Sequence, residues 1–167
     1  MFRRFFIIAI CLACTACGFH PVYGVNKYQS TGVETHLAAT NIDTIPDFEG
    51  QFLRNLLIDR FHRKGAQGAQ YILNIKPITE SVRNLDITKT SDSTRAQLQL
   101  TTSMSLTDID GKILMSQNLN AIVSYNILAS EFSTRVSEKN AQENGLHELA
   151  EQIETRVSLY FKRASAP

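Results

Sequence analysis

Cysteine has the most reactive side chain in this 167-residue sequence, and all three copies stand near its start, at Cys11, Cys14 and Cys17. No cysteine follows them, so the sequence contains no framework of structural disulfides. The chemistry left to such a thiol is covalent modification. The neighbouring residues decide which modification fits.

The residues before the cysteines are typical of an export signal. Arg3 and Arg4 supply a short positive region, and the nine residues 5–13 form an apolar run. This run is too short to cross about 30 Å of hydrocarbon as a helix, whereas it fits the apolar core of a signal peptide. The arginine pair lacks the surrounding residues of a twin-arginine signal, which favours the general secretory route.

Small residues precede the third cysteine, because Thr15 and Ala16 stand directly before Cys17. This is the pattern of a bacterial lipoprotein signal, in which the peptidase requires small side chains before the cut and the cysteine thiol first takes a diacylglycerol. We therefore predict that residues 1–16 are a lipoprotein signal peptide and that Cys17 is the lipidated first residue of the mature chain. Two or three acyl chains, at about 0.8 kcal/mol per buried CH₂, would anchor it stably.

Two alternatives to this prediction stay open. Cys14 occupies the position where leucine is usual in such signals, and it could itself be the acylated residue. Ordinary signal cleavage would instead leave a soluble periplasmic product. In the lipoprotein interpretation, Gly18 stands where an aspartate would be associated with inner-membrane retention, so we expect the outer membrane as the destination.

The mature chain is predicted to begin with an extended tether and a weak first strand. Residues 17–35 contain Pro21 and glycines, which disfavour regular structure, and residues 36–45 form the strand. A helix of about 17 residues follows, with Thr44, Pro46 and Asp47 as its start signal and Gly65 as its end. The apolar residues at helical spacing are Phe48, Phe52, Leu53, Leu56, Leu57 and Phe61.

Three further strands are predicted in the middle of the chain. Residues 70–79 form one strand, in which Pro77 makes the later part an edge or a bulge. The polar residues 80–94 are expected to be a loop or a frayed extension of two strands. Apolar and polar residues then alternate over 96–106, a turn at 108–111 closes a hairpin, and the return strand runs over 112–125. The apolar face of the hairpin is expected to comprise Ala96, Leu98, Leu100, Thr102, Met104, Leu106, Ile113, Met115, Leu119, Ala121, Val123 and Tyr125.

The opposite face of this hairpin carries hydroxyl and amide side chains. A final helix, with Ser137 as a possible cap, is expected to end near Arg163, before a tail over residues 164–167. The order strand, helix, strand, strand, strand, helix predicts a single α+β domain over residues 36–163, in which about four strands form a mostly antiparallel or mixed sheet with both helices on one face. The polar face is then left for water or for a partner. Its candidate residues are Gln97, Gln99, Thr101, Asn118 and Asn120.

Catalysis finds little support in the sequence. The histidines are scattered without partners at metal-ligand spacing, so we predict no metal site and no cofactor. There is no Gly-x-Ser-x-Gly elbow, no phosphate-binding glycine loop and no defined carboxylate pair, which disfavours an enzyme. The histidines are His20, His36, His62 and His147.

The net charge of the chain does not identify a partner either. The formal net charge of +1 argues against a nucleic-acid binder that works by neutralising phosphates. Four cations near the predicted loop and hairpin could nevertheless meet lipid phosphates through charge-assisted hydrogen bonds, although solubility explains each of them equally well. These candidates, chosen by charge and position alone, are Arg83, Lys89, Arg95 and Lys112.

Three stretches resemble the lipopolysaccharide-assembly lipoprotein family LptE, in its alphaproteobacterial form. Residues 17–24 read CGFHPVYG and are similar to the Cys-Gly-Phe-x-Pro-Leu-Tyr-Gly of that family. Residues 45–57 contain Ile-Pro-Asp and then GQFLRNLL at the start of the first long helix. Residues 124–126, Ser-Tyr-Asn, lead into the last helix, which ends Leu-Tyr-Phe. The first stretch is the specific one, since the other two are also compatible with ordinary helices.

The resemblance implies a small α+β lipoprotein that sits as a plug inside the outer-membrane barrel LptD. Such a pair receives lipopolysaccharide from the periplasmic side and places it in the outer leaflet, without bond chemistry. A polar sheet face would suit a water-filled barrel lumen. The alternative is a free-standing outer-membrane lipoprotein that acts as a ligand-binding or cell-wall-associated module, because the same fold permits both. A hydrolase is a distant third, since it needs a nucleophile that the sequence does not offer.

Overall fold

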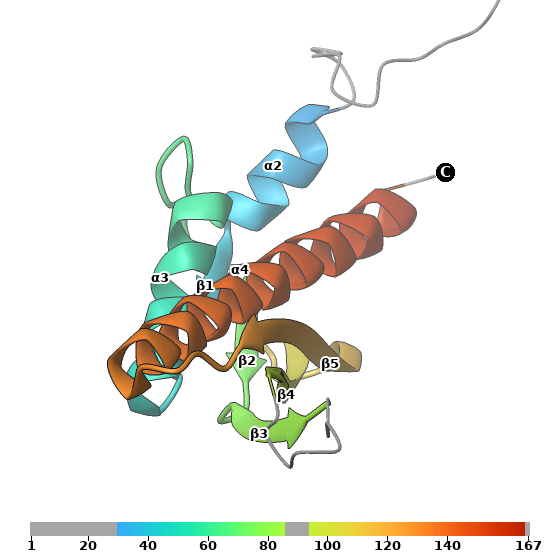
Figure 1. Cartoon of the computed structure of the whole chain (residues 1–167). Helices are drawn as coiled ribbons and strands as arrows, with labels where there is room; N and C mark the ends of the chain where they lie inside the picture. The colour runs from blue at the N-terminus through green and yellow to red at the C-terminus, as the bar shows by residue number, and fades with distance from the viewer. Residues whose placement is uncertain (1–29, 86–93, 166–167) are drawn as a thin grey trace, which may run out of the picture. The chain divides into compact units, whose positions relative to one another are not determined.

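The structure, a computed structural model, describes residues 30–85 and 94–165. Its helices and strands form an α+β fold with three helices and a mixed sheet, which confirms the predicted fold class (Figure 1). In chain order they are α2 (Ser30–Ala38), β1 (Thr40–Ile42), α3 (Asp47–Phe61), β2 (Tyr71–Ile75), β3 (Thr79–Asn84), β4 (Arg95–Asp108), β5 (Ile113–Asn126) and α4 (Glu131–Ala164).

The sheet is built around β4. β5 runs antiparallel to β4 and pairs with it along almost its whole length. The other edge of β4 is shared by β2 and β3, which are both antiparallel to it. β1 pairs with β2 and is parallel to it. Pro77 stands in the break between β2 and β3, as its missing N–H requires. The sheet therefore has five strands instead of four. Residues 80–84, expected in a loop or a frayed extension, join Thr79 in a separate strand that pairs with β4.

The alternation predicted for the hairpin is confirmed, with one exception. Even-numbered residues of β4 from Ala96 to Leu106 are buried, whereas the intervening residues are half-exposed. Ile113 was expected on the apolar face but is 64% exposed. The register explains the difference: Leu106 pairs with Met115 while Thr107 pairs with Ile113, so a bulge at Leu114 moves Ile113 to the other face.

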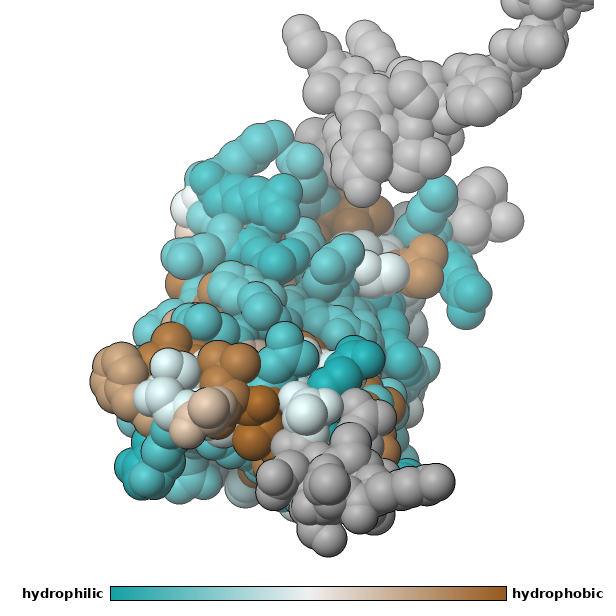
Figure 2. Space-filling model, viewed as in Figure 1, coloured by the Kyte–Doolittle hydropathy of each residue, from teal (hydrophilic) through white to brown (hydrophobic). Residues whose placement is uncertain are grey.

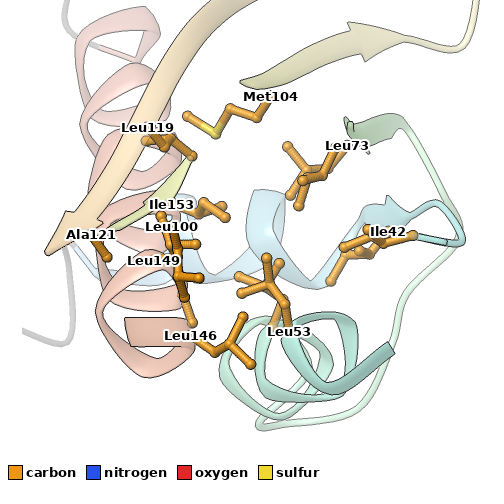
Figure 3. Packing of buried hydrophobic residues seen from close by; sticks show 14 of the residues in the cluster. Ile42, Leu53, Leu73, Leu100, Met104, Leu119, Ala121, Leu146, Leu149 and Ile153 are labelled. Carbon is orange, nitrogen blue, oxygen red and sulfur yellow. The ribbon is translucent and has the colours of Figure 1, made fainter. Parts of the chain in front are cut away.

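Helices α3 and α4 cover the apolar face of the sheet and enclose the core (Figure 3). From α3 the buried apolar residues are Leu53, Leu57 and Phe61, while Phe48, also predicted in the apolar stripe, is 71% exposed. From α4 the core receives Leu146, Leu149, Ala150, Ile153, Val157 and Phe161. Glu154 of α4 joins the two helices, because its carboxylate binds Arg60 at 2.9 Å and Arg63 at 3.0 Å.

Two boundaries near the start of the described chain differ from the prediction. Residues 30–38 are helical, where the end of an extended tether and the start of a strand were expected, and the strand is reduced to Thr40–Ile42. The ring of His36 stacks on Phe161 with centroids 5.0 Å apart, and Leu37 is buried. Helix α2 therefore packs against α4, which is far away in the sequence, and no local pattern could reveal this contact.

The final helix begins earlier than predicted. Ser130 is its N-cap and accepts a hydrogen bond from the backbone N–H of Ser133, whereas Ser137 lies inside α4. The first residues of α4 bury no side chain before Ala141, and Phe132 is 77% exposed. Brown apolar colour gathers over this end of α4 in Figure 2. These turns lack the buried stripe that identifies a helix in sequence, which is why the predicted start fell too late.

Candidate binding face of the sheet

One face of the sheet, which we call the polar face, is not covered by α3 or α4. It holds the odd-numbered residues of β4 and the side chains that the register places beside them, because alternate residues of a strand point to the same side. Its charged members are Arg83 and Arg95, and its aliphatic members are Ile72, Ile113 and Ile122. The polar face consists of Ile72, Asn74, Thr79, Ser81, Arg83, Arg95, Gln97, Gln99, Thr101, Ser103, Ser105, Thr107, Ile113, Ser116, Asn118, Asn120, Ile122, Ser124 and Asn126.

The structure brings all five polar candidates together on this face. Thr101 pairs with Asn120, and Asn118 pairs with Ser103, the next outward residue of β4. Gln97 and Gln99 continue the row toward the start of β4. The register of a predicted hairpin was sufficient to find this patch.

A shallow open depression of about 570 Å³ lies in the middle of the polar face. The break between β2 and β3 contributes to it, since Lys76 and Pro77 line it beside Thr79. The backbone bridges this break, because the Lys76 N–H donates to Ser103 O at 2.9 Å and the Thr102 hydroxyl donates to Lys76 O at 2.7 Å. Sequence reasoning missed Lys76, although its place directly before Pro77 was a signal that it stands at an edge.

The predicted cations do not form one cluster. Arg83 pairs with Gln97, and Arg95 precedes that residue by two on the same face, so the two guanidinium groups lie at one end of the sheet. Lys112 follows the turn at the opposite end of the 14-residue β4, roughly 35–45 Å away at the usual rise per residue. Lys89 lies outside the described residues.

One tyrosine behind the sheet has a shifted pKa. Burial raises the pKa of Tyr125, and the neighbouring carboxylates Glu138 and Glu80 raise it further. The Tyr125 hydroxyl hydrogen-bonds with Glu138, which favours the neutral phenol. This group links β5 to α4 and lies on the inner side of the sheet, away from the polar face.

The described residues contain no cluster of three or more His, Cys, Asp or Glu that could hold a metal ion. Within the same part of the chain, no helix is both long and apolar enough to cross a bilayer. Three of the four histidines have ordinary packing roles: His36 stacks on Phe161, His62 lies 3.1 Å from Thr40 O, and His147 meets the ring of Phe52 edge-on. His20 lies outside the described residues.

The fold defines a class of small α+β domains found in bacterial lipoproteins of known structure. A candidate lipoprotein of Caulobacter crescentus CB15 superposes with a TM-score of 0.62, covering 81% of this chain and 98% of that one at 20% identity. A minor lipoprotein of Acinetobacter baumannii gives a TM-score of 0.56, with 73% and 92% covered at 21% identity. At this level of identity the likeness concerns the fold alone.

Comparison of the sequence with models of known families identifies the family. The model of the family LptE, described as lipopolysaccharide-assembly, matches residues 36–157, so the chain belongs to this family. An uncharacterized protein of Rickettsia prowazekii (strain Madrid E) is 26% identical over 159 residues, which span 95% of this chain and 97% of that protein. The resemblance found in the sequence is thereby confirmed at the level of the family.

Proposed function

We propose that this protein is the outer-membrane lipoprotein subunit of a lipopolysaccharide translocon, in which it plugs the LptD barrel, assists its assembly and helps deliver lipopolysaccharide to the outer leaflet. The observation that carries this proposal is the polar face, which has nineteen side chains and only two charges, those of Arg83 and Arg95. Soluble surfaces usually carry about 25–35% charged residues. A large, nearly uncharged polar face is better suited to a polar, water-containing barrel lumen.

Attachment to the membrane is the second part of the proposal. Residues 1–16 act as the signal peptide, and Cys17 carries the lipid at the start of the tether. Residues 30–35, which the sequence placed in that tether, belong to α2, so the folded domain begins earlier than residue 36. The chain performs no bond chemistry in this role; it positions a barrel and its lipid cargo.

Recognition of lipopolysaccharide is assigned to cations at the edge of the polar face. Arg83 and Arg95 lie together at one end, and guanidinium groups bind phosphates through paired, charge-assisted hydrogen bonds. Lys76 adds a cation at the central depression. These three cations are the groups of the polar face and its depression that would attract a negatively charged lipid A phosphate.

The alternative of a free-standing ligand-binding module rests on the central depression beside Thr101 and Asn120. Its openness to solvent favours the translocon, because sites for small ligands bury most of the ligand surface. The two proposals differ in what the protein binds in the envelope.

The test is an affinity pull-down of the tagged full-length chain, extracted with detergent from its native envelope. We expect a large barrel protein in a near one-to-one ratio. Thr101→Arg places a charge in the centre of the polar face and should abolish this recovery. Asn55→Arg adds the same charge on the exposed side of α3 and serves as the matched control. Elution of the wild-type chain alone, with lipid on Cys17, would move the function to the free-standing module.

A further inference from the structure

The sequence of β5 lacks the residue types that protect strand edges in soluble proteins. Its 14 residues, Ile113–Asn126, contain no charged residue, no proline and no glycine. By contrast, β3 has six residues, two of them charged, and begins shortly after Pro77, while β1 has only three residues. Proteins normally keep exposed edges short, charged or interrupted by proline, so the edge of β5 is exceptional within this sheet.

The hydrogen bonds identify the backbone groups that this edge presents. The Ile127 N–H donates to Thr94 O at 2.9 Å, so odd-numbered residues here direct their backbone groups toward β4. Even-numbered residues such as Ile122 and Ser124 therefore direct theirs away from β4. Gln152 of α4 agrees with this assignment, because its amide reaches Asn120 O at 3.0 Å. Among the described strands, β5 pairs with β4 alone.

A polar stripe of α4 runs beside this edge. Ser137, Asn140 and Asn144 line a hollow of about 380 Å³ together with the last residues of β5. Farther along α4, Gln152 contacts Asn120 and Arg156 hydrogen-bonds with Gln117. The edge of β5 and this stripe together form a groove, which we call the β5 groove. Its floor is a row of backbone donors and acceptors. Its wall carries amides and a hydroxyl, with the guanidinium groups of Arg95 and Arg156 toward its two ends.

We propose that the β5 groove binds an extended segment of the barrel partner, which adds to the sheet as a further strand. A row of backbone donors and acceptors beside a helix selects an extended polypeptide. This inference rests on the proposed function, since Asn118 and Asn120 belong to both the polar face and the edge. A partner that covers that face therefore reaches the groove.

The segment comes from a loop or a chain end of the barrel protein. The strands of a closed barrel pair with one another all the way round, so they leave no free edge for β5. A loop that enters the lumen has backbone groups available for pairing. A second copy of this chain is the competing occupant, because two β5 edges could also pair with each other.

The first test measures amide hydrogen exchange in peptides spanning residues 117–126, in the full-length chain alone and in its complex with the co-expressed barrel. The amides of Asn118, Asn120, Ile122 and Ser124 should exchange freely in the chain alone. They should slow by at least about tenfold in the complex, as for backbone groups that become paired. The amides that bond to β4 should be protected in both samples.

The second test separates backbone pairing from side-chain contact. Ile122→Pro removes one outward N–H that β4 does not use, and Ile122→Ala shortens the same side chain but keeps the N–H. Recovery of the barrel with proline should be about fivefold or more below recovery with alanine, the effect of one lost hydrogen bond, because both variants shorten the side chain and only proline removes the N–H. If the proline variant folds poorly, the exchange measurement on the wild-type chain still tests the proposal.

The outcomes are distinguishable. A complex that forms while the outward amides of β5 stay unprotected overturns the groove and leaves the proposed function intact. Protection in the chain alone that grows with its concentration assigns the edge to a second copy, which also overturns the inference. Failure to recover any barrel overturns the proposed function, and the groove assignment with it.

Discussion

At the scale of single residues, two glycines show how closely the helices approach their neighbours. A Cβ at Gly50 would lie 2.6 Å from Ile45 Cγ2 and 3.0 Å from the Ile45 backbone carbon. A Cβ at Gly145 would lie 2.8 Å from Leu100 Cδ1, the far end of a flexible side chain. Ile45 is fully buried at the entrance to α3, so it has no room to move.

The first prediction compares alanine at these two positions. Gly50→Ala should lower the free energy of unfolding by about 1–3 kcal/mol, the usual cost of overpacking. Gly145→Ala should change it by much less, because Leu100 can rotate and alanine gains about 1 kcal/mol of helix propensity over glycine. Urea unfolding of the purified variants measures both. Equal losses would mean that Leu100 is held as rigidly as the Ile45 backbone.

Tyr125 gives a prediction about pH. Its pKa in the folded protein is raised by burial and by Glu138 and Glu80, whereas in the unfolded chain it is about 10. The folded state therefore holds the phenolic proton more tightly, and stability is lost as pH rises from about 10 through the folded-state value. We expect Tyr125→Phe to remove this part of the alkaline loss. Thermal unfolding from pH 8 to 11 tests it, and identical curves for both proteins would contradict it.

At the scale of the elements, the two long helices depend on each other through Glu154. Its carboxylate binds Arg60 and Arg63, so one residue of α4 holds the end of α3. Arg60 and Glu154 are each partly buried, which makes this pair better placed than the fully exposed pairs of the chain. Its contribution still falls in the range of pairs reached by solvent.

Glu154→Gln should destabilise the protein by about 0.5–1 kcal/mol at low salt. The loss should shrink at high salt, because ions screen a pair that solvent reaches. Glu151→Gln, at an exposed position of α4, makes the same change of charge without the arginine partners and is the control. Urea midpoints at two salt concentrations distinguish the variants. A loss that salt does not alter would indicate packing instead of charge.

Elements with a clear periodicity were predicted well, and elements held by distant contacts were not. The alternation of β4 and β5 was visible because both strands are apolar on one side only. Helix α2 and the first turns of α4 show no such pattern: the first stacks on Phe161, and the second projects with Phe132 exposed. Strand β3 is exposed along its whole length, so its polar residues resembled a loop.

At the scale of the whole molecule, the candidate cations are divided between the two ends of the sheet. Arg83 and Arg95 share one end, and Lys112 stands at the other. A single phosphorylated lipid A headgroup therefore cannot be bound by all of them together. Of the described candidates, only Arg83 and Arg95 lie close enough along the sheet to bind one headgroup together.

We expect Arg83→Glu, Lys89→Glu and Arg95→Glu combined to weaken lipopolysaccharide binding in vitro while the fold stays intact. A second triple variant, with Lys64, Lys139 and Lys162 changed to glutamate, alters the net charge equally at exposed positions elsewhere. Lys112→Glu alone shows whether the far end contributes. Binding is measured by co-elution with purified lipopolysaccharide, and the fold by circular dichroism. Unchanged binding in the first variant would remove Arg83, Lys89 and Arg95 from the candidates.

The sequence alone determined the fold class, the polar side of the hairpin and the family, because each depends on residues that are close together in the chain. Helical spacing and period-two alternation indicated the fold class, the same alternation indicated the polar side, and a short motif after Cys17 indicated the family. Only the tertiary structure decided where Ile113 points, that residues 79–84 pair with β4, and that Arg83 lies far from Lys112. It also decided that β5, among the described strands, pairs with β4 alone and runs beside α4. These features depend on register and on which strand lies beside which, and both are set by contacts between residues far apart in the chain.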